Sequence, residues 1–230
     1  MFVLFLIMNL AGEFIDFPAP MTLLRAQYML KMRLEPGGGV IAYGGVGILD
    51  NLQFGISWGG DNIIGYGDAR FYSLPGVQIF YKFFNDPAVM LGFNSQGYGH
   101  YEENTESYSV KSRGIFLTVG KSFFNIVTLA GGVNYCSIER EAPQKVDIFF
   151  GCAFNLTKEL TLLMDYEAGL NDPQIKDFRG YLNAGLRFTF EDVISVEIDF
   201  RNLTETNAYD PGSNTGRINR TVKIIYRDFL

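Results

Sequence analysis

The sequence predicts an all-β fold: a single up-and-down antiparallel transmembrane β-barrel of about 12 strands. Three observations predict it: short turns at nearly even spacing, alternation of apolar and polar residues, and long polar loops between successive turns. The short turns centre on residues 50–51, 85–87, 124–125, 158–159 and 191–192. Counted from residues 50, 86, 124, 158 and 192, the intervals are 36, 38, 34 and 34 residues, with 38 more to the C-terminus. Each interval fits one strand, one long loop and one returning strand, as in a transmembrane barrel.

The first predicted strand, residues 24–34, shows the alternation most clearly. Apolar residues alternate there with Arg25, Gln27, Lys31 and Arg33, whereas a helix would spread these polar residues around its whole surface. Further strands are predicted near residues 40–49, 52–58, 77–84, 89–93, 114–121, 126–137, 147–155, 160–169, 181–190, 194–201 and 218–230. A tilted strand of roughly 9–11 residues crosses the hydrocarbon layer, and closure into a barrel leaves no exposed sheet edge in lipid.

Composition and charge limit the function classes. Apolar residues make up 47% of the 230 residues and charged residues 19%, and the formal net charge is −6. This balance is typical of strands that face lipid on one side and water on the other, and it argues against nucleic acid as a partner, which favours a basic surface.

The barrel architecture predicts a location in the bacterial outer membrane. An even number of strands places both termini at the end with the short turns, which is periplasmic in such barrels.

The N-terminal residues differ from the rest of the chain. Residues 1–11, MFVLFLIMNLA, match the apolar region of a signal peptide, yet no basic residue precedes Arg25 and no clean cleavage site follows. We therefore divide the chain into a signal or N-terminal segment, residues 1–20, and an outer-membrane barrel, residues 21–230. The first segment has three possible fates: cleavage, a position along the membrane, or entry into the lumen as a plug.

The two cysteines are predicted to remain free thiols. Cys136 and Cys152 fall on neighbouring strands, but the alternation points Cys136 inward and Cys152 outward. Side chains on opposite faces of a barrel wall cannot form a disulfide.

Inward-facing polar residues form the strongest chemical pattern. The residues predicted to line the lumen are Arg25, Gln27, Lys31, Arg33, Asp165, Glu167, Asn183, Arg187, Glu197, Asp199, Arg201, Lys223 and Arg227. Basic residues of the first and last strands should meet where the barrel closes and form a basic stripe. The acidic residues of the ninth and eleventh strands, with Arg187 and Arg201 among them, should form an acidic stripe on a different wall. One interpretation is a transverse field across an open pore. The other is internal charge pairing that fills a narrow lumen.

No pattern indicates catalysis, a metal or a cofactor. His100 is the single histidine, in a predicted loop near Ser95, Ser107 and Ser109, and no flanking motif marks a nucleophile. The carboxylates are scattered, and Gly59-Gly60 does not lead a strand into a helix. We predict that the protein is not an enzyme and uses no cofactor.

Five long loops are predicted to face outward. They span residues 59–75, 96–112, 138–145, 170–178 and 203–216. The second carries Glu102, Glu103 and Glu106, which form either a solvated acidic loop or a cation-bridged contact with lipopolysaccharide.

Several Gly-rich segments carry a resemblance to a known family. They are NLQFGISWGGDNIIGYG at 51–67, NSQGYGHY at 94–101, GGGV at 37–40, GGVNY at 131–135 and GYLNAG at 180–185. With them, most of residues 17–230 resembles uncharacterised outer-membrane barrels related to the YjbH type, which are linked with exopolysaccharide systems in Gram-negative bacteria. The resemblance implies an outer-membrane barrel and a connection with surface polysaccharide, and it carries over no catalytic residue.

Two functions follow from these observations. The charged lumen predicts a passive channel for ions or small polar solutes. The resemblance and the long loops predict instead a non-enzymatic structural or accessory barrel in surface-polysaccharide export or envelope architecture. Expected partners are outer-membrane lipid and lipopolysaccharide, and polysaccharide or periplasmic proteins. The barrel-assembly machinery is also expected, because the final strand carries Tyr226 and Phe229.

Overall fold

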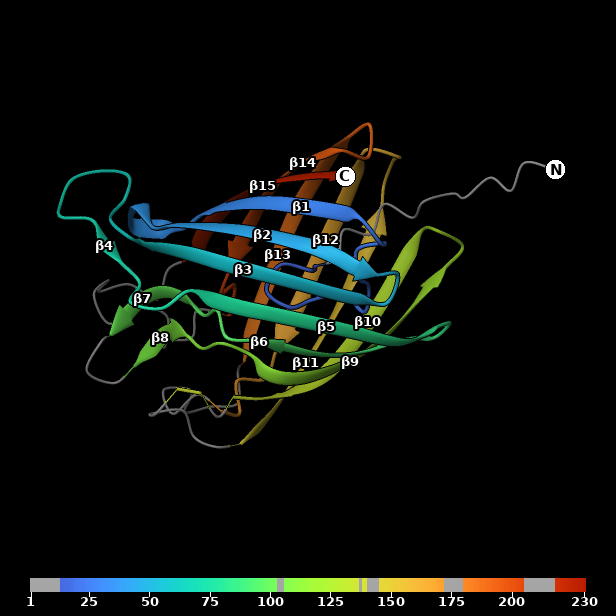
Figure 1. Ribbon diagram of the computed structural model, residues 1–230, viewed down its shortest axis with the longest axis horizontal. Helices are drawn as coiled ribbons and strands as arrows, with labels where there is room; N and C mark the ends of the chain where they lie inside the picture. Colours follow the sequence, from blue (N-terminus) through green and yellow to red (C-terminus); the bar gives the residue numbers. More distant parts are fainter. Residues whose placement is uncertain (1–12, 103–105, 137, 140–144, 172–179, 205–217) are drawn as a thin grey trace.

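The computed structural model describes residues 13–102, 106–136, 138–139, 145–171, 180–204 and 218–230. In this part of the chain twelve strands form a closed antiparallel β-barrel (Figure 1). The barrel strands are β1 (Gln27–Leu34), β2 (Val40–Leu49), β3 (Leu52–Asp61), β5 (Gly76–Asn85), β6 (Ala88–Asn94), β9 (Gly114–Phe123), β10 (Val127–Tyr135), β11 (Val146–Asn155), β12 (Leu160–Glu167), β13 (Tyr181–Phe190), β14 (Ile194–Arg201) and β15 (Asn219–Phe229). The predicted fold is confirmed.

Closure comes from the pairing of the first strand with the last. β1 pairs with β15 on one side and with β2 on the other, and each remaining strand neighbours the next along the chain. Between β9 and β10 the hydroxyls of Ser122 and Thr128 are 2.7 Å apart. The closed ring satisfies the backbone groups that an open edge would expose to lipid.

Side chains alternate between the two faces of the wall, as the pleat of a strand requires. Along β9, residues 114–121 alternate strictly between buried and exposed. Large apolar side chains such as Leu117, Ile148 and Ile198 are exposed on the outer face, where lipid would cover them. The two thiols follow the same rule: Cys136 is buried, Cys152 is half-buried on the outward face, and neither forms a disulfide, as predicted.

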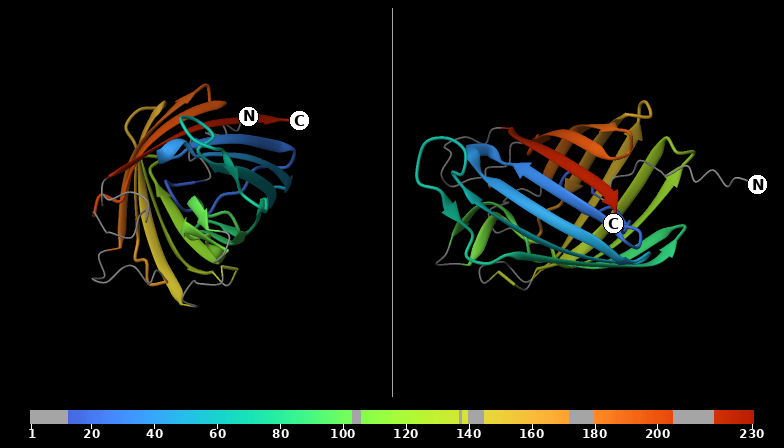
Figure 2. Two further views of the ribbon diagram at one scale, coloured as in Figure 1. Left: turned by 90° about the vertical axis from the view of Figure 1, so that its left-hand side faces the viewer. Right: turned by 45° about the horizontal axis from the view of Figure 1, so that its top comes forward.

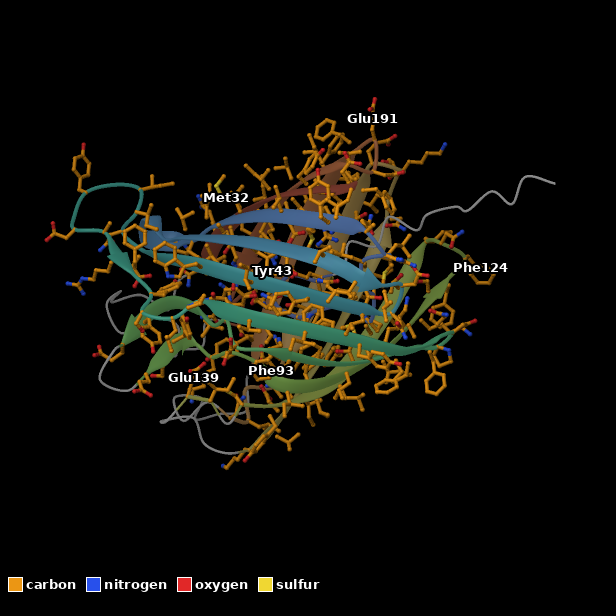
Figure 3. All side chains as sticks on the ribbon, viewed as in Figure 1. Met32, Tyr43, Phe93, Phe124, Glu139 and Glu191 are labelled. Carbon is orange, nitrogen blue, oxygen red and sulfur yellow. The ribbon has the colours of Figure 1, made fainter. Side chains whose placement is uncertain are left out.

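Short turns join the strands at one end of the barrel. Phe124 and Asn125 have φ of 53° and 57°, and Glu191 and Asp192 have φ of 48° and 59°. Two successive positive φ values are typical of the hairpin turns whose twist matches that of the paired strands. Figure 3 shows Phe124 and Glu191 at this end, and Glu139 toward the opposite, loop-bearing end.

Two predicted loops contain secondary structure. In the 59–75 loop, β4 (Arg70–Phe71) pairs with the end of β3. In the 96–112 loop, β7 (Tyr98–Glu102) and β8 (Ser107–Val110) form a separate hairpin, which we call the loop-end hairpin. A short 3-10 turn, η1 (Pro36–Gly38), connects β1 to β2. Among the described residues, no helix is long and apolar enough to span a membrane.

Candidate functional site

Residues 13–23, which we call the lumen strap, lie inside the ring of strands. Figure 2 (left) shows this dark-blue segment within the barrel. Phe14, Ile15, Phe17 and Ala19 are each at most 2% exposed. Of the fates that the sequence left open, residues 13–20 therefore show entry into the lumen, and residues 1–12 lie outside the described residues.

Wall residues near the short turns hold the C-terminal end of the lumen strap. The amide of Leu23 donates to Oε1 of Gln53 at 2.9 Å, and Nε2 of Gln53 donates to the hydroxyl of Tyr43 at 2.9 Å. The hydroxyl of Thr22 donates to the carbonyl of Asp50 at 3.0 Å. These contacts fix where the chain passes from the lumen to β1.

The lumen strap reverses direction around Asp16. The amide of Phe14 donates to the carbonyl of Phe17 at 2.8 Å, which closes the bend. The rings of Phe14 and Phe17 stack with centroids 4.6 Å apart. The bend therefore presents two rings and the Asp16 side chain to the surrounding barrel.

One side of the lumen, which we call the apolar wall, packs against the phenylalanines. Its buried side chains come from the barrel strands β5, β6 and β9 to β12: Phe80, Met90, Phe116, Ala130, Phe149, Ala153 and Leu163. The rings of Phe17 and Phe149 have centroids 4.7 Å apart. This cluster removes the strap's apolar surface from water, which favours its position inside the barrel.

The opposite side, which we call the charged wall, consists of β1 and β13 to β15. Its buried charged side chains are Lys31, Arg33, Arg187, Glu197, Asp199, Arg201 and Lys223. None is more than 8% exposed. Charged side chains that are buried to this extent are expected to form ion pairs, because burying an isolated charge costs a large amount of free energy.

Ion pairs link neighbouring strands of the charged wall. Lys223 lies directly opposite Glu197 in the β14–β15 register, and Nζ of Lys223 is 2.6 Å from Oε1 of Glu197 and 3.1 Å from Oδ2 of Asp199. Arg187 on β13 donates from Nε to Oε2 of Glu197 at 2.6 Å. The acidic residues therefore lie between basic ones along the same wall.

The lumen strap adds its own groups to this wall. Nζ of Lys31 is 2.6 Å from both carboxylate oxygens of Glu13. Lys223 donates to the carbonyl of Ile15 at 2.6 Å, and Arg187 donates to the carbonyl of Glu13 at 2.8 Å. Charge-assisted bonds of this kind are stronger than neutral ones.

Asp16, at the bend, binds the guanidinium groups of Arg33 and Arg201. Arg201 contacts Oδ2 of Asp16 through Nε and Nη2, each at 2.8 Å, and Nη2 of Arg33 is 3.2 Å from Oδ1. Nδ2 of Asn183 also donates to Oδ2 of Asp16, at 3.0 Å. This carboxylate is the most densely hydrogen-bonded group of the strap among the described contacts.

The loop-end hairpin reaches the same two arginines from the other side. The guanidinium carbon of Arg33 lies 3.8 Å from the ring centroid of Tyr98, and that of Arg201 lies 5.7 Å away. Glu139 anchors the hairpin by accepting from the amides of Tyr108 at 3.2 Å and Ser112 at 2.6 Å. Burial raises the pKa of Glu139, and these amides oppose the rise. Two inserted segments thus meet at Arg33 and Arg201.

The structure places the predicted lumen residues as follows. Buried in the interior are Lys31, Arg33, Asp165, Asn183, Arg187, Glu197, Asp199, Arg201 and Lys223. Gln27, Glu167 and Arg227 are half-buried. Arg25 differs from the expectation, because it is exposed in the turn before β1, where its amide donates to Asp50 at 3.1 Å.

The separate basic and acidic stripes predicted on different walls do not form. Glu197 and Asp199 lie within ion-pair distance of Lys223 on the neighbouring strand. The reason is closure: β15 pairs with both β1 and β14, so the basic first strand and the acidic β14 are separated by a single strand. The charged wall therefore shows the internal pairing that the sequence left as the second interpretation.

Sequence reasoning missed several residues of this site. Glu35 pairs with Arg33 and Arg201. Because side chains two positions apart in a strand share a face, its place two residues after Arg33 could have indicated that Glu35 also points inward. Arg113 pairs with Glu167 on β12 at 2.9 Å, and its guanidinium carbon lies 4.8 Å from the ring centroid of Phe149 on β11, so it joins an acidic side chain to the apolar wall. No local signal identified Asp16 as a partner of residues almost 200 positions away.

Of the histidine and serines considered for catalysis, the side chains of His100 and Ser109 lie outside the described residues. Glu103 of the acidic loop lies outside them as well. Within the described chain, no group of three or more His, Cys, Asp or Glu side chains could hold a metal ion.

Solved structures similar to this chain are outer-membrane porins. The KdgM porin aligns with a TM-score of 0.55 at 11% identity, over 89% of this chain and 99% of its own. The KdgM porin in complex with disordered oligogalacturonate gives 0.53 at 11% identity, with the same coverage. No protein-family model and no curated protein matches the chain. At these identities the similarity shows the fold: a porin-like β-barrel.

Proposed function

We propose that this protein is a passive outer-membrane channel for ions or small polar solutes, with the lumen strap restricting the path. The observation that carries the proposal is the charged wall. Stability alone does not require buried ion pairs, because replacing them by apolar residues of similar volume is often neutral or stabilising. The apolar wall shows that apolar side chains can pack inside this barrel. A charged wall beside it therefore points to a role in contact with polar solutes.

The porin fold supports this proposal. The KdgM structures are of a porin, and one of them contains oligogalacturonate. A barrel of the same architecture can thus hold a channel. The proposal for this chain includes no catalytic step, and it places the short turns and both termini on the periplasmic side.

A second function is favoured by the lumen strap itself. A lumen occupied by buried phenylalanines suits a structural or accessory barrel, and the resemblance to YjbH-type proteins would connect it with surface-polysaccharide export or envelope architecture. In that case the charged wall would serve to seat the strap.

Single-channel recording of the folded protein in planar bilayers, with a salt gradient, separates the two. We expect discrete steps of low conductance, with a reversal potential that shifts in Lys31→Gln because this change removes a wall charge bound to Glu13. Lys121→Gln is the control, since Lys121 is exposed near the short turns. A protein that inserts but shows no steps, even after loosening of the strap by Phe17→Ser, would favour the accessory barrel.

A further inference from the structure

Side chains of the barrel surround the Asp16 carboxylate in the same way that a binding site surrounds a ligand. Four donor contacts from Arg33, Arg201 and Asn183 converge on its carboxylate, at 2.8–3.2 Å. These three side chains belong to the barrel and are at most 2% exposed. Two guanidinium groups and an amide directed at one carboxylate form a specific carboxylate site.

The barrel itself orients these donors. Nη1 of Arg201 is 3.4 Å from Oε2 of Glu35, and Nε of Arg33 also pairs with Glu35. Oδ1 of Asn183 accepts from the amide of Asn202 at 2.9 Å. These contacts do not involve the lumen strap, so the site stays preorganised when Asp16 leaves it, which favours binding of another carboxylate.

A hydrogen-bond acceptor lies beside the carboxylate site. The amide of Asp16 donates to Oδ2 of Asp165 at 2.8 Å, while Nδ2 of Asn183 donates to Oδ1 at 2.7 Å. In aspartate the amide nitrogen is attached to the carbon β to the carboxyl group. A 3-hydroxycarboxylate carries a hydroxyl donor on the equivalent carbon, and a uronic acid does so through its 4-hydroxyl group.

We propose that Arg33, Arg201, Asn183 and Asp165 form a binding site for 3-hydroxycarboxylates, uronic acids included, and that Asp16 occupies this site as an internal competitor. The inference rests on the proposed channel function, because it names the solute class that would reach the site through the lumen. The strap is covalently attached, so its effective concentration is high and a free solute must compete with it. Removing the Asp16 carboxylate should therefore free Arg33, Arg201 and Asn183 for an added carboxylate, whose hydroxyl then replaces the backbone amide of residue 16 at Asp165.

Calorimetric titration of the detergent-folded full chain tests this directly. The probes are glucuronate, glucose as the partner without a carboxylate, 3-hydroxybutyrate, and butyrate as the partner without the hydroxyl. We expect Asp16→Ala to bind glucuronate roughly tenfold more tightly than the wild-type chain, because one charge-assisted competitor is lost. Glu13→Ala is the matched control: it removes the strap's other carboxylate, which binds Lys31 and not this site.

In the Asp16→Ala background, Arg201→Gln should abolish glucuronate binding, and Asn183→Ala provides a second site variant if the first does not fold. The proposal would be overturned if Asp16→Ala did not bind glucuronate, or if Glu13→Ala bound it as tightly as Asp16→Ala does. It would also be overturned if glucose bound to Asp16→Ala as tightly as glucuronate. Butyrate binding as tight as that of 3-hydroxybutyrate would overturn the role of Asp165. Because calorimetry needs no current, a silent channel that binds glucuronate rejects the channel alone, and a conducting channel that ignores glucuronate rejects this inference alone.

Discussion

The charged wall and the apolar wall form one lumen, yet they are built by opposite means. On the charged wall, Lys223, Glu197 and Arg187 satisfy one another across adjacent strands. On the apolar wall, rings such as Phe116 and Phe149 need no partner beyond close packing. The charged wall is therefore sensitive to the loss of any single member, whereas the apolar wall is sensitive to lost volume.

The lumen strap matches both walls. Its carboxylates Glu13 and Asp16 bind basic side chains, while Phe14 and Phe17 join the apolar cluster. Each wall can therefore be perturbed separately, either in the barrel or in the strap.

The largest effect is expected when the charged wall loses a central cation. Lys223→Met leaves Glu197 and Asp199 buried with less compensation, so the free energy of unfolding should fall by about 3–5 kcal/mol. Denaturant unfolding in lipid vesicles, followed by the gel shift between folded and unfolded barrel, measures this. Lys121→Met removes an exposed pair with Asp86 and should cost at most about 1 kcal/mol. Equal losses in the two variants would contradict the paired, buried character of the charged wall.

Next in size is the loss of a strap ring from the apolar wall. Phe17→Ser removes the contact with Phe149 and should weaken the seating of the strap by about 3 kcal/mol, the scale of a large-to-small core substitution. Because the strap is not a barrel strand, we expect higher single-channel conductance and faster proteolysis of the N-terminal segment, with little change in barrel unfolding. Phe124→Ser, at an exposed turn, is the control. Unchanged conductance would mean that the strap does not restrict the path.

The smallest effect is expected at Arg113, which pairs with Glu167 and packs on Phe149 of the apolar wall. Arg113→Lys keeps the charge but loses the two-pronged contact with Glu167 and the stacking on Phe149, so about 1–2 kcal/mol of unfolding free energy should be lost. Arg113→Met should cost more, since it also leaves Glu167 without this cation. A lysine variant as stable as the wild-type chain would show that charge alone matters at this position.

Much of the barrel could be predicted from local patterns. The alternation in residues 24–34 and the turns at Phe124-Asn125 and Glu191-Asp192 depend on neighbouring residues alone, because the strand period and the turn backbone are local properties. Lys31, Arg33 and Lys223 could be assigned to the interior for the same reason. The short strands of the loop-end hairpin were missed, because its register is interrupted between Tyr98 and Tyr101 and it has no long alternating run.

Local sequence patterns specify the barrel strands, their inward and outward faces, the free thiols and most of the buried charges. The tertiary structure sets which charges meet, because closure of β1 on β15 brings together residues from the two ends of the chain. It also decided that the lumen strap lies inside, since Asp16 meets Arg201 across 185 residues. Strand period is read from adjacent residues, but a filled lumen depends on packing among segments that are distant in sequence.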